Sequence, residues 1–280
     1  MAVLLDGKAL AAKIRKEIAS EVSELKSRGI TPALAVIIVG DDPASRKYVD
    51  NKKKDCAECG IKSIEIALPA DVPEDVLLGK IGELNSDRGV HGILVQLPLP
   101  KAFDERRIID AIDPAKDVDA FHPSNVGRIM IGNYGFVPCT PAGVMALLDE
   151  YSISPEGKNC VVIGRSNIVG KPMAMLLLQR NGTVTICHSK TKNLPEITKR
   201  ADILVCAVGK AGFLTADMVK PGAVVVDVGM NAVDGRLTGD ADFENVSRLA
   251  GFITPAPGGI GPMTRVMLLK NTLKAAKNSL

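Results

Sequence analysis

The sequence contains no tryptophan, and only 3% of its 280 residues are aromatic. Any large core must therefore consist of Val, Ile, Leu, Ala and Met, and a 46% share of hydrophobic residues is enough to build one. No apolar run approaches the roughly 18 residues that span a bilayer. The apolar run at the N-terminus is also too short for a signal peptide. We therefore expect a cytoplasmic protein that does not bind membranes.

The sequence also lacks a strong charge bias and clustered metal ligands. Lys and Arg number 35 against 32 Asp and Glu, and the basic residues are spread along the chain, so we expect no nucleic-acid partner. The three histidines (91, 122 and 188) have no metal-ligand spacing, so we expect no metal. Cys56-Ala-Glu-Cys59 has the spacing of a redox or zinc pair. Because no second pair and no nearby histidine completes a site, a structural role is the favoured interpretation.

Apolar runs and amphipathic segments alternate along the chain, which predicts a parallel α/β fold. The predicted strands are 34–39, 62–68, 92–98, 160–164, 183–187, 202–208 and 223–228. The predicted helices include 10–25, 43–60, 73–84, 104–112, 140–151 and 263–277, whereas 113–139 is rich in Pro, Gly and Asn and is expected to be irregular. We predict two doubly wound units with a cleft between them, the second of them Rossmann-like. Their boundaries are 1–139 and 140–262, with a final helix at about 263–280 that packs back on the first unit.

The stretch from Val161 to Pro172 has the pattern of a strand, a glycine turn and a helix N-terminus. Unpaired N–H groups and the helix dipole make such a turn an anion site, which predicts a dinucleotide pyrophosphate cradle. The pattern departs from the usual G-x-G-x-x-G fingerprint, because Ser166 replaces the second glycine and Gly170 comes one residue late. An ordinary strand–helix turn is the alternative.

The end of the next predicted strand indicates which dinucleotide would bind. NAD-binding proteins place an Asp or Glu there, about 20 residues after the first glycine, to bind the ribose 2′-hydroxyl. The segment 183–191 contains no carboxylate but offers Ser189, Lys190 and Thr191, and Arg165 lies inside the glycine turn. Donors and positive charge suit a 2′-phosphate, so we expect NADP. The alternative is that these are solvated loop residues.

Three polar residues of one predicted helix, Ser45, Tyr48 and Lys52, are spaced so that they share a face. Gln96 ends the third predicted strand, where ligands gather in open α/β sheets, and Asp119 follows in an irregular segment. A lysine becomes an acid/base catalyst when burial lowers its pKa from about 10.4 toward 7–8. These residues are candidates for the catalytic site, and a merely solvated helix face is the alternative.

Longer motifs then identify a family. In chain order they are Tyr48-Val-x-x-Lys52-x-Lys54, Val95-Gln-Leu-Pro-Leu-Pro100, Asp117-Val-Asp-Ala-Phe-His-Pro-Ser-Asn-Val-Gly-Arg128, Pro138-Cys-Thr-Pro141, Gly164-Arg-Ser-x-x-Val-Gly-x-Pro172 and Pro255-Ala-Pro-Gly-Gly-Ile-Gly-Pro-Met-Thr264. Over essentially its whole length the chain resembles the bifunctional methylenetetrahydrofolate dehydrogenase/methenyltetrahydrofolate cyclohydrolase family.

The resemblance implies two reactions of one-carbon metabolism that serve purine biosynthesis. Methylenetetrahydrofolate is oxidised by NADP+ to the methenyl cation, which is then hydrolysed to formyltetrahydrofolate. Lys52 matches the catalytic lysine, Gln96 the residue that holds it, and Asp119 the carboxylate that binds the pterin. Tyr48 matches the ring that packs on the folate, and Ser45 a nearby hydroxyl.

The resemblance also implies binding residues and a partner. Further folate contacts are expected at Val95, Leu97, Pro257, Gly258 and Gly259. Cofactor contacts are expected at Gly164, Arg165, Ser166, Ser189 and Met230. The family analogy suggests a homodimer joined through the cofactor domain. Ala120 stands where the family commonly has glycine, which would restrict the backbone beside Asp119.

Two other functions are compatible with parts of the sequence. A dehydrogenase without the cyclohydrolase step is disfavoured because the Lys52–Gln96 pair is intact. A nucleotide-sensing module without turnover would keep the glycine turn, but it would have no need of Tyr48, Lys52, Gln96 and Asp119 together.

Overall fold

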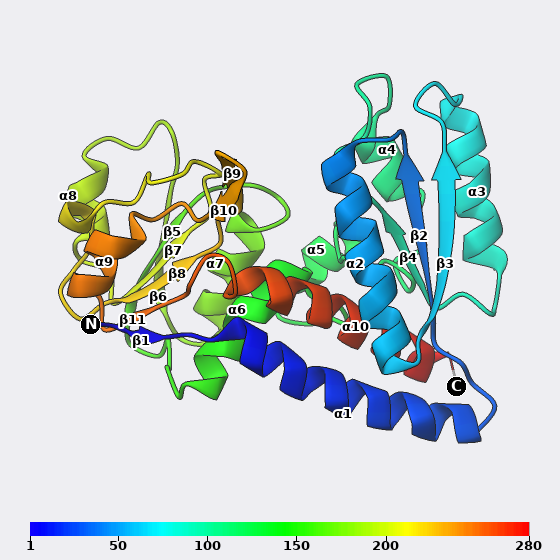
Figure 1. Cartoon of the computed structure of the whole chain (residues 1–280), viewed down its shortest axis with the longest axis horizontal. Helices are drawn as coiled ribbons and strands as arrows, with labels where there is room; N and C mark the ends of the chain where they lie inside the picture. Colours follow the sequence, from blue (N-terminus) through cyan, green and yellow to red (C-terminus); the bar gives the residue numbers. More distant parts are fainter. Residues whose placement is uncertain (280) are drawn as a thin grey trace. The chain divides into compact units, whose positions relative to one another are not determined.

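Two parallel β-sheets, each with its own helices, form the structure, which is a computed structural model (Figure 1). It describes residues 1–279, without the side chain of Ala44. The six-strand unit comprises Met1–Ala12, Ile129–Asn133 and Pro138–Thr264. The three-strand unit comprises Lys13–Arg128, Tyr134–Val137 and the chain from Arg265 onward. The α/β class predicted from the sequence is confirmed.

The sheet of the three-strand unit has its first strand in the middle. Its order is β3 (Lys62–Leu68), β2 (Ala33–Val39) and β4 (Gly92–Val95), all parallel. All seven residues of β2 are buried, as expected for a strand with both faces covered. Alternate residues of β2 and β4 pack in one core cluster with α3 (Glu74–Ser86) and α4 (Glu105–Asp110). The chain thus places β3 on one side of β2 and β4 on the other. This reversal of strand order makes the carboxyl end of β2 a switch point, where ligands usually bind.

Helix α2 (Pro43–Cys59) carries the predicted catalytic face, and its ends are well defined. The Asp42 side chain accepts a hydrogen bond from the Ser45 N–H at 2.7 Å, and Pro43 begins the helix. Gly60 ends it with φ of 73°, a left-handed conformation that glycine adopts without steric cost. The chain therefore leaves β2 and enters α2 by a short capped turn, which fixes the helix beside the end of the sheet.

The sheet of the six-strand unit is also parallel and contains a second switch point. Its order is β1 (Val3–Leu4), β11 (Phe252–Ile253), β8 (Val224–Asp227), β7 (Ile203–Cys206), β5 (Asn159–Ile163) and β6 (Thr183–Cys187). Strand β5 lies between β6 and β7, so the turn that follows it opens at the reversal of strand order. Helix α7 (Gly170–Gln179) comes next, with Pro172 in its first turn as predicted.

Other elements agree with the predictions to within a few residues, apart from several short ones. Helices α1 (Gly7–Ser27), α6 (Cys139–Glu150) and α10 (Ile260–Asn278) were all expected. The segment predicted to be irregular contains α5 (Pro123–Met130), so that prediction was wrong in part. Strands β1 and β11 were not predicted, nor was the hairpin of β9 (Asn231–Val233) and β10 (Arg236–Thr238). Helices α8 (Leu194–Thr198) and α9 (Phe243–Leu249) were expected without defined bounds. Within residues 1–279, no helix is both long and apolar enough to cross a membrane.

Candidate functional site

Lys52 and Gln96 are in direct contact in the three-strand unit. The Lys52 Nζ donates to Gln96 Oε1 at 2.8 Å. Gln96 follows the last residue of β4, and its backbone N–H donates to Ile37 O, which ties it to the central strand. Its Nε2 donates to Leu97 O at 2.6 Å, so its amide oxygen faces the lysine. A half-buried ammonium group is thus held by a neutral acceptor at the carboxyl edge of the sheet.

The other residues of the α2 face differ in exposure. Tyr48 is 41% exposed, which leaves its ring available to a ligand. Ser45 is only 6% exposed and lies at the start of the helix. The two lie four and seven residues before Lys52, at helical spacing on its side of the helix. The roles of Tyr48 and Ser45 stay predictions.

Asp119 is half-buried. An isolated parallel bridge pairs Asp117 with Ile93 of β4, and the chain turns directly after it, where the Ala120 N–H donates to Asp117 O. The Asp117 carboxylate is buried and accepts from the His122 N–H and from Asn125 Nδ2. It therefore has a structural role, and Asp119 remains the candidate for ligand binding.

Ala120 has φ of 60° and its side chain is fully buried. A left-handed backbone costs a residue with a Cβ about 1–2 kcal/mol. The restriction expected beside Asp119 is therefore a real feature of the backbone. The hydrogen bonds from Asn271 Nδ2 to Val118 O and Val137 O hold the segment in place despite this cost.

The glycine turn after β5 fits a dinucleotide because it has no room for side chains. A Cβ on Gly170 would lie 2.3 Å from Gly164 O, and one on Gly164 would lie 2.5 Å from Ala207 O. Gly164 also has φ of 135°, and its N–H donates to Cys187 O. The backbone is thus packed closely where the turn meets the next two strands, as the glycines of a dinucleotide fold require.

The predicted cofactor contacts Arg165, Ser166, Ser189 and Met230 are all exposed in the six-strand unit. Ser166 Oγ accepts from the Val169 and Gly170 N–H groups at 3.2 and 3.3 Å, so it closes the turn that leads into α7. These hydrogen bonds give the serine at the second glycine position a structural role. Arg165 precedes Ser166, and Ser189 follows β6, the strand next to β5, so both extend from the carboxyl ends of the strands.

Two buried carboxylates, Asp227 and Asp240, hold the loops that follow β7 and β8. Asp240 accepts from the N–H groups of Val208, Gly209 and Lys210 at 2.7, 3.0 and 2.8 Å. Asp227 accepts from the N–H groups of Gly229, Asp240 and Ala241. Burial raises the pKa of Asp227 above its ordinary value, and its backbone hydrogen bonds offset only part of this rise. Sequence reasoning missed these residues, although an Asp that ends the apolar run 223–226 was a usable signal.

The predicted folate loop, Pro257 to Gly259, lies in the six-strand unit before α10. Gly258 has φ of 110° and its carbonyl accepts from the Lys8 N–H, while the Gly259 N–H donates to Pro255 O. Lys52, Gln96, Tyr48 and Asp119 lie in the three-strand unit. The cleft expected between the units stays a prediction.

The Cys56–Cys59 pair has no reactive character. Both thiols are buried and free. Burial raises the pKa of Cys56 to about 12 and that of Cys59 to about 11, so both stay protonated near neutral pH. In the described part of the chain, no three His, Cys, Asp or Glu side chains are grouped to hold a metal ion.

Gly170→Ala should destabilise the fold by about 2–4 kcal/mol and weaken NADP binding, since the new methyl group meets the Gly164 carbonyl. Gly79→Ala is the matched control. Its Cβ would meet nothing within 4 Å on α3, so helix propensity should stabilise it by about 1 kcal/mol. Denaturant unfolding and cofactor titration of both variants measure the difference. Equal stability of the two variants would show that the turn tolerates a side chain.

Comparison with known proteins agrees with this geometry. The catalytic-domain model of the tetrahydrofolate dehydrogenase/cyclohydrolase family matches residues 5–119, and the NAD(P)-binding-domain model matches residues 138–280. The bifunctional protein FolD of Acetivibrio thermocellus is 61% identical over 99% of this chain and 97% of its own length. That of Halalkalibacterium halodurans is 60% identical, with 99% of each chain covered.

Solved structures give the same result. The bifunctional FolD of Campylobacter jejuni is 53% identical, with a TM-score of 0.99 and all of both chains covered. The FolD of Trypanosoma brucei, solved with NADP cofactor and an inhibitor, is 41% identical with a TM-score of 0.96 over 99% of this chain and 98% of that one. The chain therefore belongs to the tetrahydrofolate dehydrogenase/cyclohydrolase family.

Proposed function

We propose that Lys52 exchanges the protons in the hydrolysis of the methenyl cation, the second of the two reactions that this chain catalyses. As a member of its family it is a methylenetetrahydrofolate dehydrogenase (NADP+) and a methenyltetrahydrofolate cyclohydrolase. The observation that carries the proposal is the 2.8 Å contact from Lys52 Nζ to Gln96 Oε1, at the sheet edge where α/β folds bind ligands.

The two reactions place different demands on the protein. Hydride departure from the methylene carbon is assisted by the lone pair of the substrate's own nitrogen, so this step needs positioning more than an acid or a base. Water addition to the methenyl cation needs a proton acceptor, and ring opening needs a proton donor. Lys52 is the one group proposed for both proton transfers, accepting the proton from water and returning it to the departing nitrogen.

Gln96 supports this role because it is neutral and oriented. An amide oxygen holds the lysine side chain in place without adding a negative charge that would fix its proton. In the proposal Asp119 pairs with the amino-pyrimidine edge of the pterin, and the exposed ring of Tyr48 packs on it. Ser45 supplies a nearby hydroxyl. Further folate contacts are assigned to Val95, Leu97, Pro257, Gly258 and Gly259.

The six-strand unit fits NADP at the turn after β5. When bound, NADP+ supplies the hydride acceptor. Gly164, Arg165, Ser166, Ser189 and Met230 would hold it, with Arg165 and Ser189 on the 2′-phosphate. In functional terms the proposal assigns residues 1–139 to folate chemistry and 140–262 to the cofactor.

One assay tests the function. Purified protein is mixed with methylenetetrahydrofolate and either NADP+ or NAD+, and the absorbances of the reduced cofactor and of the methenyl species are followed together. The proposal expects reduced cofactor without lasting accumulation of methenyltetrahydrofolate. Persistent methenyl product would indicate a dehydrogenase alone, and cofactor binding without reduction would indicate a sensing module.

We also propose that the chain works in the cytoplasm as a homodimer joined through the six-strand unit. Strand β6 forms one edge of that sheet, with Ile186 37% exposed, and Leu178 on α7 is 52% exposed. Exposed apolar side chains beside an unpaired strand edge favour association with a second chain. The six free cysteines suit a reducing compartment. Sedimentation velocity tests the dimer, and cell fractionation tests the compartment.

A further inference from the structure

A pocket lies in the three-strand unit, at the end of the sheet opposite to Lys52 and Gln96. It is lined by residues at or just before the starts of the three strands, namely Thr31, Lys62 and His91, and by segments near 88, 116, 136 and 278. Its volume is about 1140 Å³. Small-molecule pockets measure about 300–1,000 Å³, so this one accommodates an organic molecule and not merely a single ion.

His91 supplies a hydrogen-bond donor to this pocket. It is 8% exposed, and its Nδ1 accepts the Ala33 N–H at 3.2 Å, so the proton of the neutral ring is on Nε2. Burial lowers its pKa, and the positive charge of Lys116 lowers it further. The ring is therefore neutral at pH 7 and keeps one fixed tautomer. With Nδ1 engaged by the Ala33 N–H, Nε2 is the ring atom that can donate to a ligand in the pocket.

Positive charge dominates the lining. The lining contains four basic side chains and one carboxylate, that of Asp113, which leaves a formal excess of three positive charges. The basic residues are Lys62, Arg88, Lys116 and Arg128. This excess equals the net charge of the entire chain, +3. The Asp113 carboxylate already accepts the Ala115 N–H, and that of the neighbouring Asp87 accepts the Gly89 N–H. The pocket therefore has a local field that attracts anions.

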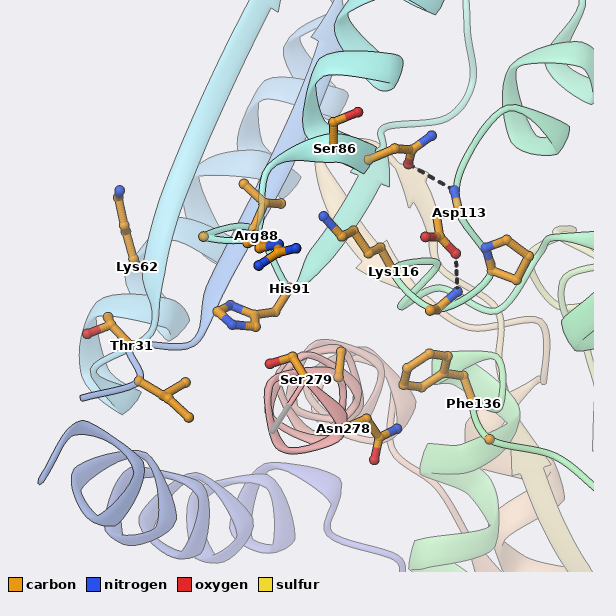
Figure 2. A pocket seen from close by; sticks show the side chains of 18 of the residues that line it. Thr31, Lys62, Ser86, Arg88, His91, Asp113, Lys116, Phe136, Asn278 and Ser279 are labelled. Carbon is orange, nitrogen blue, oxygen red and sulfur yellow. Dashed lines mark hydrogen bonds between the residues drawn. The ribbon is translucent and has the colours of Figure 1, made fainter. Parts of the chain in front are cut away.

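Of the four basic side chains, Lys116 binds backbone carbonyls of the fold, whereas the other three make no ion pair with the described residues. Lys116 Nζ donates to Leu84 O and Asp87 O at 2.9 and 2.6 Å, which satisfies carbonyls at the end of α3. Within the described residues, Lys62, Arg88 and Arg128 make no ion pair. Figure 2 shows Arg88, His91 and Lys116 on one side of the pocket, with Phe136 and Ser279 opposite them.

The lining also has an apolar part. Ile30, Val90, Phe136 and Ala275 contribute to it, and Phe136 is only 4% exposed. A ligand that matches this pocket therefore has two parts, an anionic group for the cations and the His91 donor, and a carbon body for the apolar side chains.

We propose that this pocket binds a small organic polyanion, either a phosphate ester or a polycarboxylate, at a site separate from both reactions. Arg88 and Lys62 hold the anionic groups and His91 donates to one of them. Because the pocket lies at the other end of the sheet from Gln96, its occupation does not block Lys52.

The test uses the full chain saturated with NADP, so that the cofactor site cannot take the probe. ATP and citrate are titrated separately by calorimetry into the unaltered protein, the double variant Lys62→Gln/Arg88→Gln and the control Arg106→Gln. Arg106 lies outside the pocket on α4, with its side chain 87% exposed. The double variant should lose about tenfold or more in affinity, because two charge-assisted contacts are removed, and the control should lose almost none.

Each result has a definite reading. Preference for ATP or citrate identifies the anion as phosphate or carboxylate. A shift of the His91 ring nitrogen resonances on addition of the probe places it in this pocket. The proposal is overturned if neither probe binds at millimolar concentration, or if the double variant binds as well as the unaltered protein. Both enzyme activities of the double variant are measured without probe and should be unchanged, which separates this proposal from the assignment of Lys52.

Discussion

Lys52→Met should lower the cyclohydrolase rate by about 10²–10⁴-fold, the usual contribution of a positioned acid/base group. Methionine keeps the length of the side chain but cannot carry a proton, and it leaves Gln96 Oε1 without its 2.8 Å donor. NADP affinity should change little, because the residues proposed to bind it belong to the six-strand unit. The rate is measured as decay of methenyl absorbance above the spontaneous rate, and cofactor binding is measured separately.

Lys47→Met is the matched control. Lys47 is exposed five positions before Lys52 on the same helix and lies outside the family motif, so its loss should affect neither activity. If Lys52→Met hydrolyses methenyltetrahydrofolate at the unaltered rate, the proton transfers must be assigned to another group. A parallel loss of NADP binding would mean instead that the variant has misfolded.

The pairing of Lys52 with Gln96 could be anticipated because two local rules place both residues at one sheet edge. Helical spacing orients the lysine along α2, and Gln96 follows the end of a parallel strand. The ends of helices α2 and α7 could also be predicted from local sequence. Pro43 and Pro172 favour a first helical turn and Gly60 favours a helix end, each by its own backbone geometry. The structure brings the two side chains into contact.

What the sequence did not predict depends on contacts between distant segments. Strand β1 has two half-exposed residues and exists only because β11, some 250 residues later, pairs with it. Asp227 and Asp240 take their role from loops that fold over them, and no local pattern reveals those hydrogen bonds. The pocket at His91 is the extreme case, because its walls come from at least five separate parts of the chain. Helix α5 was missed for a local reason: the Pro, Gly and Asn content of 113–139 was taken to indicate irregular structure, although Pro123 occupies the first turn of the helix, where proline is favoured.

We assign the preference for NADP to two exposed residues, Arg165 and Ser189, and replacing both should change it selectively. Arg165→Gln together with Ser189→Ala should weaken NADP binding by about 100-fold or more, since hydrogen bonds to a charged phosphate contribute about 1.5–3 kcal/mol each. NAD has a hydroxyl at that position, so its affinity should fall by less than about threefold. Both side chains are exposed, so the fold should be unaffected.

The comparison of NADP with NAD in one variant is decisive because both cofactors use the same glycine turn. Dissociation constants are measured by fluorescence titration of each reduced cofactor, at two salt concentrations. The loss for NADP should shrink at high salt, where charge-assisted contacts are screened. Arg200→Gln, which removes an exposed cation elsewhere in the six-strand unit, should leave the ratio of the two constants unchanged. Equal losses for both cofactors would mean that Arg165 and Ser189 contact a part common to the two molecules. The absence of a carboxylate in 183–191 would then be the remaining sequence argument for NADP.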